Sequence, residues 1–164
     1  MKLHEYQAKE VLGAFGVNVP NCAPFCFIEN DRTVGIPSVR DGGAADGINM
    51  PGPMLPGWKL VDILPALARR TERWIADAGK SGKPFFLYLP HFAVHTPIQG
   101  RPDLVEKYQG KMRSALKHKN AHYAAMVESM DSAVGRVLDK LAELKLADNT
   151  IVIFTSDNGG RITA

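Results

Sequence analysis

The sequence predicts an α/β protein in which a few parallel strands are joined by crossover helices. Two runs of residues indicate the strands, Phe-Phe-Leu-Tyr-Leu at 85–89 and Ile-Val-Ile-Phe-Thr at 151–155. Both lack polar alternation, which is typical of strands buried on both faces. A long apolar stripe at helical spacing lies between them. The order strand, helix, strand therefore indicates a βαβ unit, in which the two strands run parallel.

Length and composition favour one globular domain with a sizeable core. The chain has 164 residues, of which 45% are hydrophobic, and its 20 Lys and Arg against 17 Asp and Glu give a net charge of +3. The basic residues are scattered, so the charge suits an anionic substrate and does not indicate nucleic acid. No apolar run is long enough for a membrane span. The first residues lack the apolar core of a signal peptide, so we expect a cytoplasmic chain as written.

Residues 1–20 differ in character from the rest of the chain. A short helix is expected from His4 to Ala14, ended by Gly16 and followed by an extended segment. The sequence of residues 1–10, followed by Gly16-Val17 and Pro20, resembles the start of the β subunit of succinyl-CoA ligase. The resemblance stops before any nucleotide-binding or CoA-binding element and implies no ligase activity. We therefore expect a leader at 1–20 and a separate domain at 21–164.

The beginning of that domain is predicted to be mostly irregular. A short strand is expected at residues 25–28. Residues 32–58 then hold six glycines and four prolines without periodicity. Such a stretch is usually a functional loop or disordered, and here we expect a loop that lies over a larger body.

Regular structure is predicted to return at Asp62, as the N-cap of a helix that stops at Gly79. After the strand at 85–89 comes a loop at 91–97, and Asp103 is a candidate cap for a short helix. The clearest helix spans about Asn120 to Leu146. Its apolar stripe consists of Tyr123, Val127, Met130, Val134, Val137, Leu138, Leu141 and Leu144.

Polar residues follow both predicted strands. His91 and His95 come after the first strand, and Asp157 and Asn158 come after the second. Parallel strands place their carboxyl ends at one edge of a sheet, where ligands bind in open α/β folds, so these residues are predicted to share that edge. Carboxylate and amide oxygens are hard donors that suit a metal ion. Two simpler interpretations stay open: Asn158-Gly159 as a tight turn, and the loop histidines as solvated turn residues.

These motifs resemble a known family. Lys83 to Pro90, His95-Thr96-Pro97, the segment from Asn120 through 123–131, and Thr155-Ser156-Asp157-Asn158-Gly159-Gly160 are similar to the type I sulfatases. These are arylsulfatase-like enzymes of the alkaline-phosphatase superfamily. The resemblance runs from about residue 25 to residue 160 and implies part of the α/β fold of that superfamily.

The resemblance also implies site residues and a ligand class. His95 would contact the sulfate ester, and Asp157 and Asn158 would be Ca²⁺ ligands. The family's nucleophile is a formylglycine made from Cys or Ser, whose hydrated form attacks sulfur while calcium neutralises the developing charge. The substrate would be a small sulfate ester or a sulfated glycan. Members of the family are often exported.

Departures from the family's pattern predict that these residues form a truncated, inactive piece. The formylglycine motif is Cys/Ser-x-Pro-x-Arg, whereas Cys22-Ala23-Pro24-Phe25-Cys26 has Cys26 in place of Arg, so we expect this match to be accidental and no catalytic nucleophile to be present. The family's paired N-terminal aspartates, the Lys and His between nucleophile and this segment, and the downstream Lys are missing. Calcium binds six to eight oxygens, of which only two ligands are recognisable here.

Two alternatives to a sulfatase piece are considered. The first is a phosphatase or phosphodiesterase of the same superfamily, which fits less well because such two-zinc enzymes commonly have Asp-His where this chain has Asp157-Asn158. The second is a non-enzymatic interaction module or a non-functional fragment, whose unpaired strand edges would require a partner or a chaperone.

Overall fold

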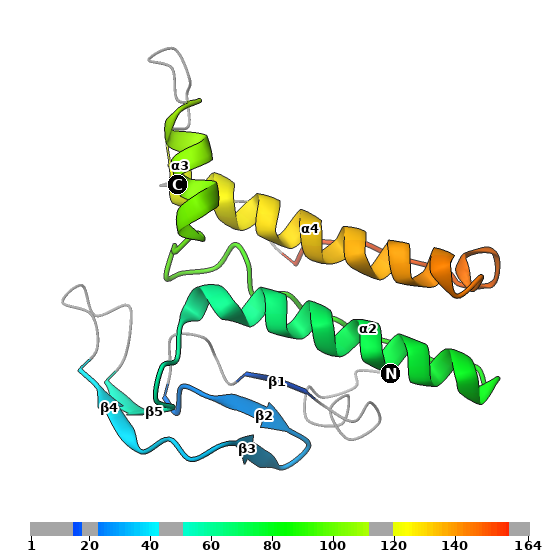
Figure 1. Ribbon diagram of the computed structural model, residues 1–164, viewed down its shortest axis with the longest axis horizontal. Coiled ribbons are helices and arrows are strands. Elements are labelled where there is room, and N and C mark those ends of the chain that lie inside the picture. Colours follow the sequence, from blue (N-terminus) through cyan, green and yellow to red (C-terminus); the bar gives the residue numbers. More distant parts are fainter. Residues whose placement is uncertain (1–14, 18–22, 43–50, 112–119, 158–164) are drawn as a thin grey trace.

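The computed structural model describes residues 23–42, 51–111 and 120–157, together with the backbone of residues 15–17. Figure 1 shows helix α2 (Ile63–Ser81) lying between two small sheets on one side and helix α4 (Ala121–Glu143) on the other. Helix α3 (Pro102–Gln109) packs against the N-terminal part of α4. Short 3-10 turns, η1 (Leu60–Asp62) and η2 (Ala147–Asn149), precede α2 and follow α4. The helix predicted at residues 4–14 lies outside the described residues.

The start of α2 agrees with the sequence-based prediction, but its end does not. Asp62 occupies the N-cap position, although its side chain makes no capping hydrogen bond. The helix continues through Gly79 and stops at Gly82, which adopts the left-handed conformation with φ 64°. Gly82 ends the helix because glycine takes up this conformation without a steric penalty. Gly79 instead gives room to a neighbour, since a Cβ there would lie 3.1 Å from Leu146 Cδ1.

Helix α4 confirms the longest predicted helix, with its start fixed by Asn120. The Asn120 side chain accepts a hydrogen bond from the Tyr123 backbone N–H at 3.0 Å, as is usual for an N-cap asparagine. The cap predicted for α3 was wrong by two positions: Arg101 is the N-cap, and Asp103 lies in the first turn. There Asp103 is placed to interact favourably with the positive end of the helix dipole.

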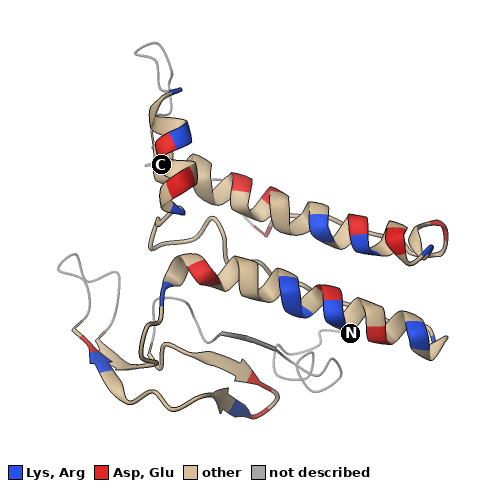
Figure 2. Cartoon of the chain, viewed as in Figure 1, with Lys and Arg blue, Asp and Glu red and all other residues tan. Residues whose placement is uncertain are grey.

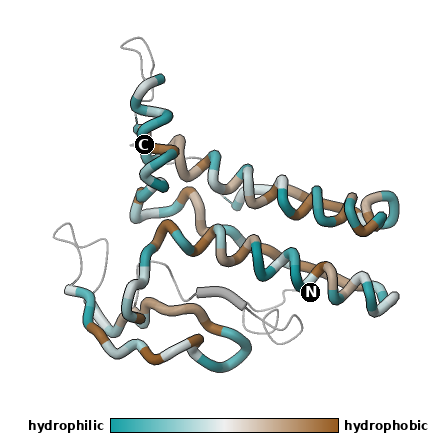
Figure 3. The backbone as a smooth tube through the Cα atoms, in the orientation of Figure 1, coloured by the Kyte–Doolittle hydropathy of each residue, from teal (hydrophilic) through white to brown (hydrophobic). Residues whose placement is uncertain are grey.

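The core is formed where α2 and α4 pack side by side, with α3 against the start of α4. Figure 3 shows hydrophobic and hydrophilic residues alternating along both long helices, as expected of amphipathic helices. The buried apolar residues on the three helices are Ile63, Leu64, Leu67, Ala68, Ile75, Val105, Ala121, Ala125, Met126, Ala133 and Leu141. An ion pair, Arg136 with Glu72, also joins α4 to α2. Burial of one face of each helix is therefore what holds this part together.

The stretch predicted to be irregular, residues 32–58, contains several short strands. Strand β2 (Phe27–Glu29) and β3 (Arg32–Val34) form a hairpin, and β4 (Val39–Asp41) pairs antiparallel with β5 (Gly52–Met54). The prediction missed them because each strand has only three residues, too few to show a period. The strand expected at residues 25–28 is confirmed as β2, displaced by about two residues.

Strand β1 (Phe15–Val17) belongs to the predicted leader, residues 1–20, and is a strand of the same sheet as β2 and β3. It pairs antiparallel with β2, with Gly16 opposite Ile28. Helix α2 packs against β1, and Arg70 of α2 forms an ion pair with Glu29 of β2. The domain boundary at residue 20 stays a prediction, but the backbone pairing crosses it.

The predicted parallel pairing of residues 85–89 with residues 151–155 is not formed. Both runs are extended, but neither belongs to a strand of the described sheets, in which all strand pairs are antiparallel. Each run follows its helix and turns back toward the end of the molecule where α3 lies (Figure 1). The side chains of residues 151–155 are exposed, with Ile151 at 90%, whereas residues 85–89 alternate between exposed, as Phe86 at 69%, and half-buried, as Phe85 against Trp74. A parallel strand is stable when neighbours cover its edges and faces, and the described residues do not supply that cover.

Beside β2, the thiol of Cys26 is completely buried. It is 0% exposed and free of any disulfide, and burial raises its pKa above the ordinary value. The neighbouring Phe25 links the two sheets, because its N–H donates to Pro53 O at 2.9 Å and its carbonyl accepts from Leu55 N–H at 2.9 Å. Among the described helices, none combines the length and hydropathy that a bilayer span requires.

Candidate functional site

His95 lies on the exposed loop that follows the first extended run. Its backbone N–H donates to Phe92 O at 2.8 Å, which closes a turn around the residues between them. The ring atom Nδ1 lies 2.8 Å from Thr96 O, and because a carbonyl oxygen only accepts, Nδ1 carries the proton in this contact. The bond fixes one side of the ring and leaves Nε2 as the nitrogen for a ligand. When the ring is protonated, Nε2–H is a cationic donor, which is suited to an oxyanion.

His91, on the same loop, has a different environment. Both ring nitrogens are buried without a hydrogen-bond partner in the part of the chain that the structure describes. Burial lowers the pKa of His91, since the low-dielectric surroundings disfavour the charged form. His91 is therefore neutral near pH 7, whereas the exposed ring of His95 is open to solvent and ligands.

The predicted metal ligands are only partly described. Asp157 ends the second extended run, and its side chain is exposed, while Asn158 lies outside the described residues. No group of three or more His, Cys, Asp or Glu is placed to hold a metal ion within residues 23–42, 51–111 and 120–157. The described residues alone thus do not make a calcium site. That His95 and Asp157 line one pocket stays a prediction.

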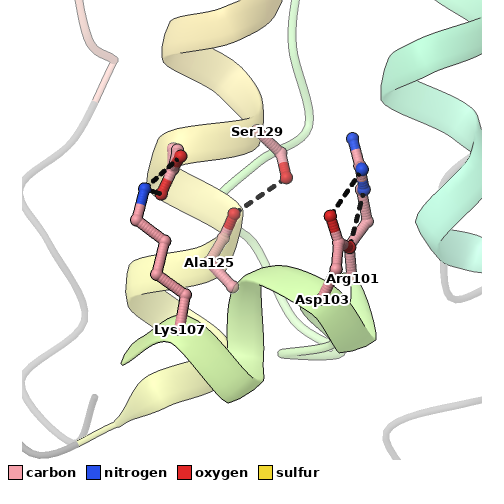
Figure 4. A network of polar contacts seen from close by, with 6 residues as sticks. Arg101, Asp103, Lys107, Ala125 and Ser129 are labelled. Atoms are coloured by element: carbon pink, nitrogen blue, oxygen red, sulfur yellow. Dashed lines mark hydrogen bonds and ion pairs between the residues drawn. The ribbon is translucent and has the colours of Figure 1, made fainter. Parts of the chain in front are cut away.

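Helices α3 and α4 anchor the far end of the His95 loop. Gly100 N–H donates to His122 Nδ1 on α4 at 3.3 Å. Gly100 is needed at this contact, because a Cβ there would lie 2.5 Å from Ala125 Cβ. Figure 4 shows the polar contacts around α3: Arg101 binds Asp103 through two hydrogen bonds, and Lys107 binds Glu128 on α4 at 2.6 and 2.7 Å.

The structure also places a cavity next to this loop that the sequence did not indicate. It has a volume of about 400 Å³ and is lined by Phe25, Asp41, Met54, Trp58, Lys59, Leu60, Val61, Pro97 and Gln99. Its walls come from β4, β5, the turn before α2 and the end of the His95 loop. The lining was missed because its residues come from separate parts of the chain, three of them from the stretch interpreted as irregular. The one sequence signal for this cavity was the pair Trp58 and Lys59, which follows a stretch rich in proline and glycine.

Charges are distributed over the surface of the helices rather than gathered in one patch (Figure 2). Many are matched locally, as in Lys80 with Asp77 on α2 and Lys140 with Glu143 on α4. At the cavity, the lining includes one positive side chain, Lys59, and one negative side chain, Asp41. The described lining of the cavity is therefore balanced in charge.

Comparisons with known proteins identify the family. A family model described as sulfatase matches residues 65–164, which include all but the first two residues of α2, the helices α3 and α4, the His95 loop and the Asp157 segment. The match covers more than half of the chain. The chain belongs to the sulfatase family, and its mixture of helices and strands is part of the family's α/β fold.

Individual proteins that are similar to this chain are also described as sulfatases. The chain is 44% identical over 103 residues to a sulfatase of Formosa agariphila, covering 58% of this chain and 19% of the relative. It is 39% identical over 82 residues to mouse arylsulfatase J, covering 50% and 13%, and 36% identical over 80 residues to human N-acetylgalactosamine-6-sulfatase, covering 48% and 13%. This chain thus spans a fifth or less of the length of these relatives.

A solved structure described as the crystal structure of Ps i-CgsB aligns with 53% of this chain and 18% of its own, at 32% identity and a TM-score of 0.46.

Proposed function

We propose that this chain supplies one part of the site of a sulfuric ester hydrolase, in which His95 binds the sulfate ester. The carrying observation is that His95 lies, exposed and held by its Nδ1 contact to Thr96 O, within the segment matched by the sulfatase family model. With Nδ1 fixed, a protonated ring donates through Nε2 to a sulfate oxygen. A charged donor of this kind stabilises negative charge on the ester as it develops.

Calcium is part of the proposal through Asp157 and Asn158. A carboxylate and an amide oxygen are ligand types that calcium prefers, but the ion takes six to eight oxygens and the described residues bring no such set together. The two residues would therefore be a minority of the ligands, and the rest would come from elsewhere in a complete site.

The 164 residues by themselves are expected not to hydrolyse a sulfate ester. They contain no Cys-x-Pro-x-Arg or Ser-x-Pro-x-Arg motif, and Cys26, where the arginine would stand, is buried beside β2. Mass spectrometry of the purified chain should find an unmodified cysteine at position 22, and 4-nitrocatechol sulfate should not be turned over. Either a formylglycine at Cys22 or genuine turnover would contradict this part of the proposal.

A chimera tests the role of His95 directly. Residues 65–164 would replace the matching segment of the Formosa agariphila sulfatase, and hydrolysis of a sulfate ester that this enzyme accepts would be measured. We expect a folded, active chimera, in which His95→Gln lowers kcat/KM by about 100-fold or more, since a lost charge-stabilising donor costs about that much.

The matched control is His122→Gln in the same chimera. His122 is an exposed histidine that accepts a hydrogen bond from Gly100, a role that glutamine's oxygen can fill. Its replacement should change kcat/KM less than about threefold, because it takes no part in binding the ester. A chimera with a native thermal transition but no turnover, or equal losses in the two variants, would overturn the assignment of His95.

A further inference from the structure

We propose that His122, in the first turn of α4, is a positioning residue for His95. It accepts a hydrogen bond from Gly100 N–H and so fixes the far end of the loop on which His95 lies. The inference rests on the proposed function, because it takes His95 as the residue that binds the ester. His122 does not contact the ester and acts only through the backbone of the loop.

The hydrogen bond from Gly100 determines which nitrogen of His122 carries the proton. A backbone N–H only donates, so His122 Nδ1, 3.3 Å from Gly100 N, is the acceptor, and the neutral ring carries its proton on Nε2. His95 has the opposite arrangement, with its proton on Nδ1 and directed at Thr96 O. Position 122 therefore needs a side chain that accepts a hydrogen bond, which most helix-forming residues do not provide.

The backbone at Gly100 is tightly packed against two helices. Gly100 is buried, and a Cβ on it would lie 2.5 Å from Ala125 Cβ on α4 and 2.9 Å from Val105 Cγ2 on α3. Figure 4 shows these two helices packed against each other. Among the described residues, His122 is the one acceptor of the Gly100 N–H. A buried N–H without an acceptor is costly, so loss of the acceptor favours displacement of Gly100 toward solvent.

The contact at Gly100 is close to His95 along the chain. Within the described residues, Gly100 is the first residue after His95 whose backbone N–H is hydrogen-bonded. Only residues 97–99 separate Gly100 from Thr96, whose carbonyl holds the His95 ring. A displacement at Gly100 therefore reaches, over a short segment, the carbonyl that orients the ring of His95.

The first test is NMR of the 164-residue chain labelled with ¹⁵N, at about pH 8, where imidazoles are neutral. Long-range ¹H–¹⁵N spectra of the rings, assigned with His95→Gln and His122→Gln, should show the proton on Nε2 of His122 and on Nδ1 of His95. His122→Leu should speed hydrogen exchange of the Gly100 amide by about tenfold or more, because its acceptor is lost. The same variant should remove the preference of His95 for one tautomer, whereas His122→Gln, which retains an acceptor, should keep it.

Ser132→Leu is the matched control for these spectra, because Ser132 is an exposed polar residue further along α4. It should change neither the exchange of Gly100 nor the tautomer of His95. A His122 ring with its proton on Nδ1 would overturn the inference. So would a His95 tautomer that is the same in His122→Leu as in the unmodified chain.

The second test measures kcat/KM in the chimera with the Formosa agariphila sulfatase. His122→Leu should lower kcat/KM by about tenfold, because a binding group that is slightly misplaced loses activity. His122→Gln should restore it to within the threefold expected above. If His122 acts through His95, His122→Leu should lower kcat/KM by less than about twofold further in a chimera that already carries His95→Gln. A general structural role would instead give equal losses in both backgrounds, and that result rejects the positioning role.

The two proposals can fail separately. A large loss in His95→Gln without any loss in His122→Leu, or with equal losses in His122→Leu and His122→Gln, rejects only the positioning role. Full activity of the His95→Gln chimera rejects the ester-binding role of His95. In that case the positioning role for the reaction is rejected as well, while the tautomer of His95 in His122→Leu still decides whether His122 orients the ring.

Discussion

The paired helices and the two extended runs make an instructive contrast. Helices α2 and α4 bury residues such as Ile75 at 1% exposure, whereas the run after α4 leaves Ile153 at 81%. The buried faces of the helices and the two runs are all apolar in sequence. They differ in where their backbone hydrogen bonds are made, since a helix satisfies its own and a strand depends on its neighbours.

The contrast explains why the helices of this chain are packed while the two runs are not. An amphipathic helix needs one partner face, and α2 and α4 provide it to each other. A strand of a parallel sheet needs partners on two edges and cover on two faces. The sulfatase segment therefore keeps its helical layer in contact while the two runs, which the sequence marks as buried, remain unpaired in the described chain.

The largest expected effect is a difference in the free energy of unfolding between two isoleucine-to-alanine variants, one in each region. Ile75→Ala should lower the free energy of unfolding by about 2–4 kcal/mol, because it removes three buried carbons and leaves a cavity. Ile153→Ala should cost less than about 0.5 kcal/mol, since the side chain is mostly in solvent. Urea denaturation followed by circular dichroism measures both. Equal losses would show that the extended run is packed in solution, and the contrast would fail.

A smaller effect is expected from two glycines of the helical region. Gly100→Ala should destabilise the chain by about 1–3 kcal/mol, because the new Cβ would lie 2.5 Å from Ala125 Cβ and 2.9 Å from His122 O. Gly135→Ala, within α4, meets no atom within 4 Å and should stabilise by up to about 1 kcal/mol, from helix propensity alone. Thermal melting of both variants provides the measurement. Similar melting temperatures would mean that the close approach at Gly100 does not exist.

The smallest effect concerns the ion pair between the helices. Arg136 donates to Glu72 at 2.7 Å through Nε and 2.5 Å through Nη2. Arg136→Met should cost about 0.5–1 kcal/mol at pH 7, a modest amount because both side chains are partly exposed and solvent screens them. The exposed Lys80–Asp77 pair lies within α2, and Lys80→Met, as the control, should cost less.

The pH dependence of that loss has a definite sign. Hydrogen bonding to Arg136 holds the pKa of Glu72 below its ordinary value of 4.5. The pair therefore stabilises the folded chain above about pH 4.5, and this stabilisation is lost as the pH falls through the lower, folded-state pKa. The difference between Arg136→Met and the unmodified chain, measured by denaturation at pH 7 and in acid, should shrink toward low pH. A difference that is independent of pH would exclude the ion pair as its source.

Most of the helical layer could be predicted from the sequence, because spacing and caps are local signals. Asn120 caps α4 as expected, and the helix from Asp62 begins where its N-cap indicates. The end of α2 at Gly82 was missed because Gly79 and Gly82 are both candidate helix ends in the sequence. The contact of Gly79 with Leu146, which explains the glycine at position 79, cannot be predicted from the sequence. Strands β3 to β5 were missed for a related reason, since their pairing depends on partners and not on period.

The candidate site was predictable in part. The order of elements and the family resemblance singled out His95, which the structure shows on an exposed loop with one ring nitrogen already bonded. The cavity beside it was not predictable, because it combines Phe25, Asp41, Trp58 and Gln99 from four separate places in the chain. A single sequence contains no signal for such a convergence.

The buried thiol of Cys26 can be used to detect local unfolding of the small sheets. A cysteine reacts with an alkylating reagent as the thiolate, which is the nucleophile, and at Cys26 burial both withholds the sulfur from solvent and raises the pKa of the thiol. Labelling at this sulfur, resolved from Cys22 by peptide mapping, therefore requires the small sheets to come apart, and at high reagent concentration it follows the rate of that opening. Comparing that rate with the unfolding of the helices tells whether the two layers of this sulfatase segment open together or one after the other.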